Sequence, residues 1–336
     1  MMTDPSWSTV HARLHQTLRQ RSLLPPQSAC LIAVSGGQDS LSLLQLLFDL
    51  QPKWGWQLAI AHCDHGWPTD AGMADHVEAI AAQFQLPFYL ATTAQQPLAQ
   101  TEAAARQWRY SELTRLAQRH GFTCVAVAHT QSDRAETLLY NLIRGAGADG
   151  LQSLTWQRPL SSGLQLVRPL LDFRRAETGE ICDRYQLPIW QDVLNQSRRY
   201  ARNRLRLEIM PLLRAQFNPQ AERAIAQTAE LLQAEVDYLE QQVQALYDQH
   251  YDPQGRRIDR RPLQPLHLAL QRRLIRRLLW QALPEMPTYE QIEAGVALIT
   301  APNRSRSSTL PGGVWLVVER PWLVVASAPP TKPLRA

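Results

Sequence analysis

The first half of the chain alternates short apolar runs with longer stretches in which apolar residues recur every three or four positions. The runs predict buried strands at residues 29–34, 58–61, 87–91 and 123–128. The amphipathic stretches predict helices at residues 40–50, 71–84, 101–120 and 132–144. Strands that alternate with helices are typical of an α/β fold with a doubly wound, mostly parallel sheet. Such sheets bind ligands beyond the carboxyl ends of their strands, so we expect the chemistry there.

The pattern changes in the second half. Residues 145–163 resemble a loop-rich segment, and residues 173–185 predict another helix. From Ile225 to Leu246, apolar residues recur at spacings of three, four or seven, which predicts one long helix. Its apolar side is expected to pack on a neighbouring domain rather than to form a free coiled coil. The chain after this long helix is expected to be helical to about residue 299.

The length of 336 residues corresponds to about two domains. We expect a catalytic α/β domain over residues 1–215, with a boundary near 215–219, and a linking helix over 216–250. A smaller, mostly helical domain over 251–328 is expected to end in a hairpin of two strands, 314–318 and 323–326. The proline-rich tail, residues 329–336, is expected to be frayed.

Composition excludes several classes of protein. No apolar run approaches ~18 residues, which argues against a membrane span, and the amino end lacks the apolar segment of a secretory signal. The four cysteines, Cys30, Cys63, Cys124 and Cys182, form no C-x-x-C pair. Their spacing argues against a zinc ribbon or a thioredoxin motif and predicts a reducing, cytoplasmic location.

The basic residues are almost all arginine, since Lys53 and Lys332 are the only lysines. The base composition of a genome can produce this preference for arginine over lysine. The placement of the arginines along the chain helps to decide whether they also bind a partner. Residues 198–214 and 256–277 each hold many arginines and one acidic residue, a pattern that suits a polyanion. Within the second cluster, four arginines share one side of a predicted helix and apolar residues the other: Arg272, Arg273, Arg276 and Arg277. We expect this helix to contact RNA phosphates; a membrane-surface helix is the alternative.

A glycine-containing hexapeptide joins the first predicted strand to the first helix: Ser35-Gly36-Gly37-Gln38-Asp39-Ser40. Its glycines permit a tight turn, and the N–H groups of a helix start can cradle an anion. An acidic residue suits such a site only if a divalent cation lies between Asp39 and the phosphates. The hexapeptide therefore predicts a Mg²⁺-polyphosphate site that differs from the Walker A pattern. The simpler alternative is a Gly-Gly turn capped by Asp39 or Ser40.

The pattern S-G-G-x-D-S resembles the PP-loop of the ATP pyrophosphatases. Further segments, in the same order along the chain, are similar to the tRNA(Ile)-lysidine synthetase family: 62–66, 102–110, 128–137, 144–151, 168–171 and 202–206. The resemblance implies an adenine nucleotide α-hydrolase-like fold that binds ATP and Mg²⁺. It also implies that the chain ligates free L-lysine to the 2-position of the wobble cytidine in tRNA(Ile) with a CAU anticodon. ATP would be cleaved to AMP and pyrophosphate, through an adenylated cytidine.

The spacing of His129, Asp133 and Glu136 would place them on one side of a helical segment at the end of a strand. The resemblance implies that Asp133 and Glu136 hold or activate the amine of lysine. The simpler alternative is that Asp133 caps its helix and that Glu136 pairs with an arginine such as Arg106 or Arg109.

The resemblance also implies roles for residues outside that helix. His62 would lie beside the adenine, a reading we prefer to a metal site formed with His65. Arg109 would face the triphosphate or the RNA and join the catalytic residues Asp39, His129, Asp133 and Glu136, with a solvated helix face as the alternative. Three arginines of residues 202–206 would contact tRNA, with pairing at a domain linker as the alternative: Arg202, Arg204 and Arg206.

The chain departs from the family pattern at Ser132, where the family usually has Asp, and at Arg134, where it has Gln. We expect activity to survive because Asp133 and Glu136 remain. Two other functions stay open: a tRNA thiolase of the same superfamily, which would need catalytic cysteines, and a catalytically silent RNA-binding protein. The oligomeric state also stays open, a homodimer included.

Overall fold

The structure is a computed structural model that describes residues 8–93, 101–191, 198 and 201–327. Contacts divide the chain into two compact units, Met1–Gln233 and Ala234–Ala336, which are described separately below. The predicted frayed tail, residues 329–336, lies outside the described residues.

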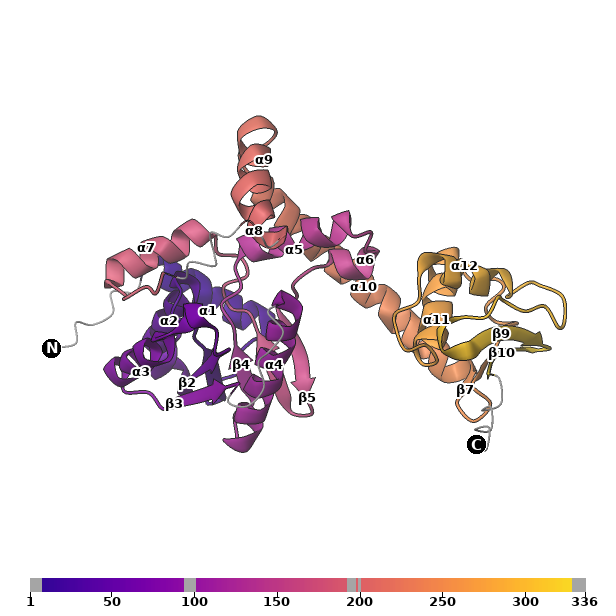
Figure 1. Cartoon of the computed structure of the whole chain (residues 1–336), viewed down its shortest axis with the longest axis horizontal. Helices are drawn as coiled ribbons and strands as arrows, with labels where there is room; N and C mark the ends of the chain where they lie inside the picture. The colour runs from indigo at the N-terminus through magenta and orange to yellow at the C-terminus, as the bar shows by residue number, and fades with distance from the viewer. Residues whose placement is uncertain (1–7, 94–100, 192–197, 199–200, 328–336) are drawn as a thin grey trace. The chain divides into compact units, whose positions relative to one another are not determined.

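The first unit is built on a six-stranded sheet in the order β3-β2-β1-β4-β6-β5 (Figure 1). The strands are β1 (Ala29–Ala33), β2 (Gln57–Asp64), β3 (Phe88–Thr92), β4 (Cys124–Ala126), β5 (Gln157–Ser161) and β6 (Leu164–Val167). All neighbouring strands are parallel except β5, which pairs antiparallel with β6 at one edge. The doubly wound, mostly parallel sheet is therefore confirmed, and all four predicted strands belong to it.

The prediction of a loop-rich segment at residues 145–163 was wrong in part, because this segment contains α6 (Ala148–Leu151) and β5. The sequence signal of β5 is weak: it includes Pro159, which is tolerated in a sheet mainly at an edge, and none of its residues is fully buried. The neighbouring strand β6 has only four residues, too few to show a clear period.

Helices cover both faces of this sheet. They are α1 (Thr9–Arg21), α2 (Gln38–Trp54), α3 (Met73–Phe84), α4 (Glu102–Arg119), α5 (Gln131–Ile143) and α7 (Arg175–Tyr185). Side chains alternate between the faces of a strand, so Ile32 of β1 packs with α1, α2, α3 and α7. Its neighbour Leu31 packs on the opposite face with Leu113 and Leu116 of α4.

The chain reverses direction across the sheet between β1 and β4. It runs from β1 outward to β2 and β3, and then returns to add β4 on the other side of β1. The carboxyl ends of β1 and β4 therefore flank a topological switch point, where open α/β sheets bind ligands. The hexapeptide follows β1 and His129 follows β4.

A helical segment follows α7 in the chain and completes the first unit. It consists of α8 (Ala201–Arg204), a π-helical turn (Leu205–Ile209), α9 (Met210–Gln216) and the first part of α10 (Ala221–His250). The predicted long helix lies within α10. Turns of π-helix are rare and are frequently found at functional sites, and this turn carries Arg206.

The second unit combines helices with a small sheet. Its elements after α10 are β7 (Tyr251–Asp252), β8 (Arg257–Asp259), α11 (Leu268–Trp280), α12 (Tyr289–Ala297), β9 (Val314–Glu319) and β10 (Trp322–Ser327). The predicted hairpin is confirmed as the antiparallel pair β9–β10. The expectation of continuous helix to residue 299 missed β7 and β8, which are too short to show a period and extend the sheet in the order β7-β8-β10-β9.

The core of this unit lies between α11 and the sheet. Leu274, Ile275, Leu278 and Leu279 of α11 are buried in one cluster with the apolar residues of β9 and β10. The predicted amphipathic character of α11 is thus confirmed. None of the helices in the described part of the chain is both long enough and apolar enough to cross a membrane.

Candidate active site

The hexapeptide forms a tight turn between β1 and α2. Gly36 has a φ of 82°, and a Cβ at this position would lie 3.1 Å from the Cβ of Trp190. The Ser35 N–H donates to Ser40 Oγ at 3.2 Å, and Ser40 Oγ donates to the Gly37 carbonyl at 2.8 Å. These bonds hold the loop closed, with Gly37 as the N-cap of α2.

Substitution of Gly36 tests the loop directly. A Gly36→Ala variant is expected to lose ATP binding, because the side chain is strained at positive φ and meets Trp190. Gly163→Ala is the matched control, since Gly163 has a φ of 73° but no atom within 4 Å of the added Cβ. Each variant should lose about 1–2 kcal/mol of unfolding free energy from the backbone strain. Calorimetry with ATP should detect weakened binding in Gly36→Ala alone. Equal affinity of both variants for ATP would contradict a role of the loop in binding ATP.

Asp39 points from the start of α2 toward the start of α7. Thr178 Oγ1 donates to one carboxylate oxygen, and Arg175 Nη1 lies 3.2 Å from the other. Burial raises the pKa of Asp39, and the negative charge of Asp133 adds to this effect while Arg175 opposes it. Asp39 therefore does not cap α2, and it interacts with a second carboxylate across the site.

Gln38 has a structural role beside the loop. Its Nε2 donates to the Arg175 carbonyl at 2.7 Å and to Thr178 Oγ1 at 2.9 Å. The side chain therefore fixes α2 to α7. Sequence reasoning missed Arg175 and Thr178, which hold the hexapeptide from a segment more than 130 residues away.

Asp133 and Glu136 lie on α5, where one arginine holds both. Asp133 Oδ2 accepts hydrogen bonds from the N–H and Oγ1 of Thr130, each at 2.8 Å, so Asp133 completes a capping box in which Thr130 is the N-cap of the helix. Its other oxygen lies 3.1 Å from Arg206 Nη2. Arg206 also forms a bidentate ion pair with Glu136, with Nε and Nη2 each 2.8 Å from a carboxylate oxygen. The arginine that pairs with Glu136 is thus Arg206, not Arg106 or Arg109.

The two carboxylates differ in their proton affinity. Burial opposes ionisation of Asp133, but Arg206 and the hydrogen bonds from Thr130 outweigh it and lower its pKa. Burial dominates at Glu136 and raises its pKa, although Arg206 opposes the shift. Two neighbouring acids with opposite shifts are suited to holding a cation and to accepting a proton.

His129 lies directly before α5 and is held neutral. Arg168 Nε is 3.3 Å from His129 Nδ1. Burial, together with the positive charge of Arg168, lowers the pKa of His129 to about 3. Arg168 is itself almost fully buried, and it donates to the Thr155 carbonyl at 2.5 Å. Its position behind His129 was not predicted, although the segment Arg168–Leu171 carries part of the resemblance.

A cavity of about 390 Å³ brings most of the predicted site residues together at the carboxyl ends of β1, β2 and β4. Its lining includes Ser35, Gly37, Asp39, Ser40, His62, Arg109, His129, Asp133 and Arg206. Glu136 instead lines a smaller adjoining cavity of about 190 Å³, which shares Arg175 and Arg206 with the first. Arg206 thus separates the hexapeptide side of the site from Glu136.

His62 is buried at the cavity wall. Its Nδ1 lies 2.8 Å from the Val34 carbonyl, and its Nε2 is buried without a partner in the described residues. Arg109 lies at the outer edge, with Nη2 3.4 Å from His65 Nε2. The described residues include no group of three or more His, Cys, Asp or Glu side chains arranged to hold a metal, so they give a metal site at His62 and His65 no support.

The remaining predicted tRNA-contacting arginines differ in their environment. Arg202 Nη2 donates to Thr137 Oγ1 at 3.1 Å, while Arg204 is exposed. In the second unit, Arg272 pairs with Glu293 at 2.6 Å, and Arg276 lies 3.2 Å from Glu240. Glu240 also pairs with Arg273, and Gln244 accepts from Arg277. Side chains of α10 and α12 therefore engage the basic side of α11.

The two departures from the family pattern both face α10. Ser132 Oγ donates to Glu222, and Arg134 pairs with Glu230 and donates to Gln233 Oε1 at 3.3 Å. Neither side chain lines the cavity that holds the hexapeptide, but Ser132 lines the smaller cavity that contains Glu136 and accepts from the Arg175 N–H at 3.4 Å. Both departures therefore contribute to the packing of α5 on α10, and Asp133 and Glu136 themselves are retained in the sequence.

The fold and the site define a PP-loop protein, an ATP-utilising class. A family model described as "PP-loop domain" matches residues 7–213, and one described as "TilS substrate binding domain" matches residues 259–323. Among solved structures, a U34-tRNA thiolase from Methanococcus maripaludis is similar with a TM-score of 0.57. It is 18% identical and covers 66% of this chain and 77% of its own, which shows a common fold alone.

Curated relatives identify the family within this class. The tRNA(Ile)-lysidine synthase of Nostoc sp. strain PCC 7120 is 51% identical over 95% of this chain and 97% of its own. That of Synechocystis sp. strain PCC 6803 is 50% identical over 91% and 94%. The chain therefore belongs to the tRNA(Ile)-lysidine synthase family of ATP-dependent ligases.

Proposed function

We propose that this chain ligates free L-lysine to the 2-position of the wobble cytidine of tRNA(Ile) with a CAU anticodon. ATP is cleaved to AMP and pyrophosphate, and the reaction passes through an adenylated cytidine. The observation that carries the proposal is the pair of adjoining cavities joined at Arg206. One contains the hexapeptide, which we propose binds the phosphates, and the other contains Glu136, so a nucleotide and an amine could meet at this arginine.

The loop residues suit ATP bound with Mg²⁺. Mg²⁺ usually binds one or two carboxylates together with substrate phosphates and water. Asp39 fits this role because its buried carboxylate interacts unfavourably with Asp133, a repulsion that a divalent cation would offset. Bound there, Mg²⁺ would neutralise charge that develops on the departing pyrophosphate. The loop N–H groups and the hydroxyls of Ser35 and Ser40 would hold the phosphates.

The α5 carboxylates suit the amine of lysine. An ammonium group must lose a proton before it can attack carbon 2 of the base. Arg206 occupies the position between Asp133 and Glu136 that a second cation would need. We propose that the lysine amine competes with Arg206 for these carboxylates and passes its proton to Glu136, whose pKa burial raises. His129 lines the cavity and, because burial lowers its pKa to about 3, it would act on the substrate as a neutral hydrogen-bonding group.

Contacts to tRNA are assigned to Arg202, Arg204 and α11. Phosphate contacts by α11 require its arginines to be shared with, or released from, Glu240 and Glu293. A Glu240→Gln variant is therefore expected to bind tRNA more tightly, and Arg276→Gln more weakly with a salt slope smaller by about one. Glu235→Gln is the matched control, because Glu235 is an exposed acid on the same helix. If filter binding at several salt concentrations finds all three variants equal, α11 is not part of the interface.

One assay separates this proposal from the two alternatives. The chain is incubated with ATP, lysine and unmodified tRNA(Ile), and the anticodon is analysed by mass spectrometry. We expect a mass increase of lysine minus water. Sulfur incorporation would favour a thiolase, and no ATP consumption would favour a silent binder.

The environments of the cysteines give the thiolase little support. Cys30, Cys124 and Cys182 are buried, and burial raises the pKa of Cys63 to about 12, which suppresses the reactive thiolate. All four cysteines are free, in keeping with the proposed cytoplasmic location. A homodimer stays a prediction.

A further inference from the structure

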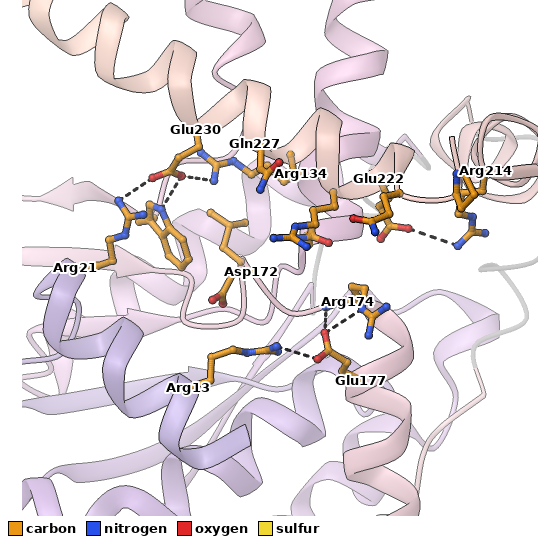
Figure 2. A pocket seen from close by; sticks show the side chains of 17 residues that line it. Arg13, Arg21, Arg134, Asp172, Arg174, Glu177, Arg214, Glu222, Gln227 and Glu230 are labelled. Carbon is orange, nitrogen blue, oxygen red and sulfur yellow. Dashed lines mark hydrogen bonds and ion pairs between the residues drawn. The ribbon is translucent and has the colours of Figure 1, made fainter. Parts of the chain in front are cut away.

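A third and larger cavity lies in the first unit. Its volume is about 710 Å³, within the range of small-molecule sites. It shares no lining residue with the cavity that contains the hexapeptide, but Arg174, Arg214 and Glu222 also line the smaller cavity that contains Glu136. Residues of α1, α5, α7, α9 and α10 line it, together with the segment before α7 (Figure 2). We call it the arginine cavity, after the residues described next.

Arginines outnumber acids in this lining. Six arginines face four carboxylates, which leaves an excess of about two positive charges when all are ionised. The arginines are Arg13, Arg21, Arg134, Arg174, Arg214 and Arg223. A phosphomonoester carries about two negative charges at neutral pH, so the excess matches one such group.

Shared glutamates hold four of the six arginines in two clusters, and Arg214 pairs separately with Glu222 at 3.5 Å (Figure 2). On one side, Glu230 accepts from Arg21 at 2.7 Å, from Arg134 at 2.5 Å and from Trp156 Nε1 at 2.9 Å. On the other side, Glu177 accepts from Arg13 at 2.9 Å and from the backbone of Arg174 at 2.8 Å. One glutamate between two arginines leaves each cluster with net positive charge.

Several buried groups of the lining have no partner in the described residues. They are Nε and Nη2 of Arg13, Nε of Arg134, Oε1 of Gln131 and Oδ1 of Asp172. The Arg13 guanidinium also lies over the ring of Phe173, at 3.7 Å from its centroid. This stacking holds the Nε and Nη2 atoms of Arg13 in place. Buried unpaired polar groups are costly. The cavity therefore lacks hydrogen-bond acceptors near two arginines and donors near Gln131 and Asp172.

We propose that the arginine cavity binds a sugar phosphate of nucleotide size, at a site separate from the hexapeptide. The phosphate accepts from Nε and Nη2 of Arg13, which have no partner in the described residues, since a guanidinium group binds phosphate through parallel hydrogen bonds. Hydroxyl groups of the sugar donate to Asp172 and Gln131. The phosphate belongs either to a free nucleotide or to a terminal nucleotide of an RNA chain, and both present the same chemistry.

Calorimetry with ribose 5-phosphate tests the proposal. The protein is first saturated with Mg²⁺ and the α,β-methylene analogue of ATP, which occupies the hexapeptide site and reports its integrity separately. Ribose 5-phosphate carries the phosphate and the hydroxyls but no base, so it does not imitate cytidine. We expect one further binding site for ribose 5-phosphate and no binding of ribose.

Variants of the lining locate that site. Arg13→Gln is expected to weaken binding about tenfold, equivalent to about 1.4 kcal/mol, and Arg223→Gln, at an exposed lining residue, to weaken it several-fold. Arg19→Gln is the matched control, because Arg19 is an exposed arginine of α1 that does not line the cavity. Absence of a second site, or equal affinity in Arg13→Gln, Arg223→Gln and Arg19→Gln, would overturn the proposal.

A second titration, with unmodified tRNA(Ile) bound, identifies the source of the phosphate. Loss of ribose 5-phosphate binding, together with weaker tRNA binding by Arg13→Gln, would assign the cavity to an RNA terminus. Simultaneous binding would assign it to a free nucleotide.

Discussion

An Asp39→Ala variant is expected to lose cytidine adenylation by at least about 10³-fold while it still binds tRNA. Asp39 is the acidic residue of the hexapeptide, and its carboxylate faces Asp133, Arg175 and Thr178. Loss of one preorganised electrostatic group in an active site typically costs about 10²–10³ in rate, and loss of a proposed metal ligand adds to this. The measurement is pyrophosphate release in the presence of ATP, Mg²⁺ and unmodified tRNA(Ile), with tRNA binding measured separately.

An Asp39→Asn variant tests whether the negative charge of Asp39 is needed, because asparagine has nearly the same shape as aspartate but no charge. The amide keeps an acceptor for Thr178 but has no negative charge. Since burial raises the pKa of Asp39, the fold disfavours the ionised form, and stability from this group falls as the pH rises through its pKa. The asparagine variant should therefore unfold at no lower temperature than the unmodified protein at neutral pH, yet be nearly as inactive as alanine. Asp75→Ala, an exposed acid on α3, should keep full activity; normal turnover by Asp39→Asn would exclude the metal role.

Local sequence patterns predict the framework that places this residue. The apolar period locates β1 and α2. The hexapeptide lies between this strand and this helix, a position that favours a phosphate-binding loop. Order along the chain also places His129 and Asp133 after β4, at the same edge of the sheet as the hexapeptide. These relations follow from the geometry of parallel sheets, in which carboxyl ends of neighbouring strands share an edge.

Contacts between distant segments could not be predicted in the same way. The orientation of Arg206 toward Glu136 depends on a π-helical turn, and no period in the sequence indicates such a turn. Glu240 lies 33 residues before Arg273, so the sequence could show that α11 has a basic side but not that α10 supplies a counter-charge. The same limit concealed Arg168 behind His129, because its place depends on how the end of β6 packs against β4.

Ser132 and Arg134 depart from the family pattern, and the structure shows which residues they contact. As isolated departures from a motif they put activity in question. In the structure, their partners are Glu222 and Glu230, which lie two turns apart on α10. Both departures therefore contribute to one helix–helix contact, and each also lines a cavity, Ser132 that of Glu136 and Arg134 the arginine cavity. Asp133 and Glu136, the residues proposed to act on lysine, are retained in the sequence.

A Glu136→Gln variant is expected to separate the two halves of the proposed reaction. In the proposed reaction, adenylation would use the hexapeptide and Asp39, whereas the amine of lysine would need a carboxylate that can accept its proton. Burial raises the pKa of Glu136, which brings it closer to that of the amine it would deprotonate, and glutamine cannot accept the proton. Because general-base catalysis contributes about 10²–10⁴-fold, lysidine formation should fall by that factor.

Rapid-quench analysis of the tRNA provides the measurement, since adenylated tRNA should accumulate when lysine transfer is slow. Glu136→Asp, which retains a carboxylate, should restore part of the transfer rate, a result that a purely structural role would not produce. Glu112→Gln is the control, because Glu112 pairs only locally with Arg115 among the contacts identified on α4. Equal losses of adenylation and transfer in Glu136→Gln would show that Glu136 supports the whole site rather than the lysine step. In that case Asp133, with its lowered pKa and its direct contact to Arg206, would be the remaining carboxylate that could receive the amine.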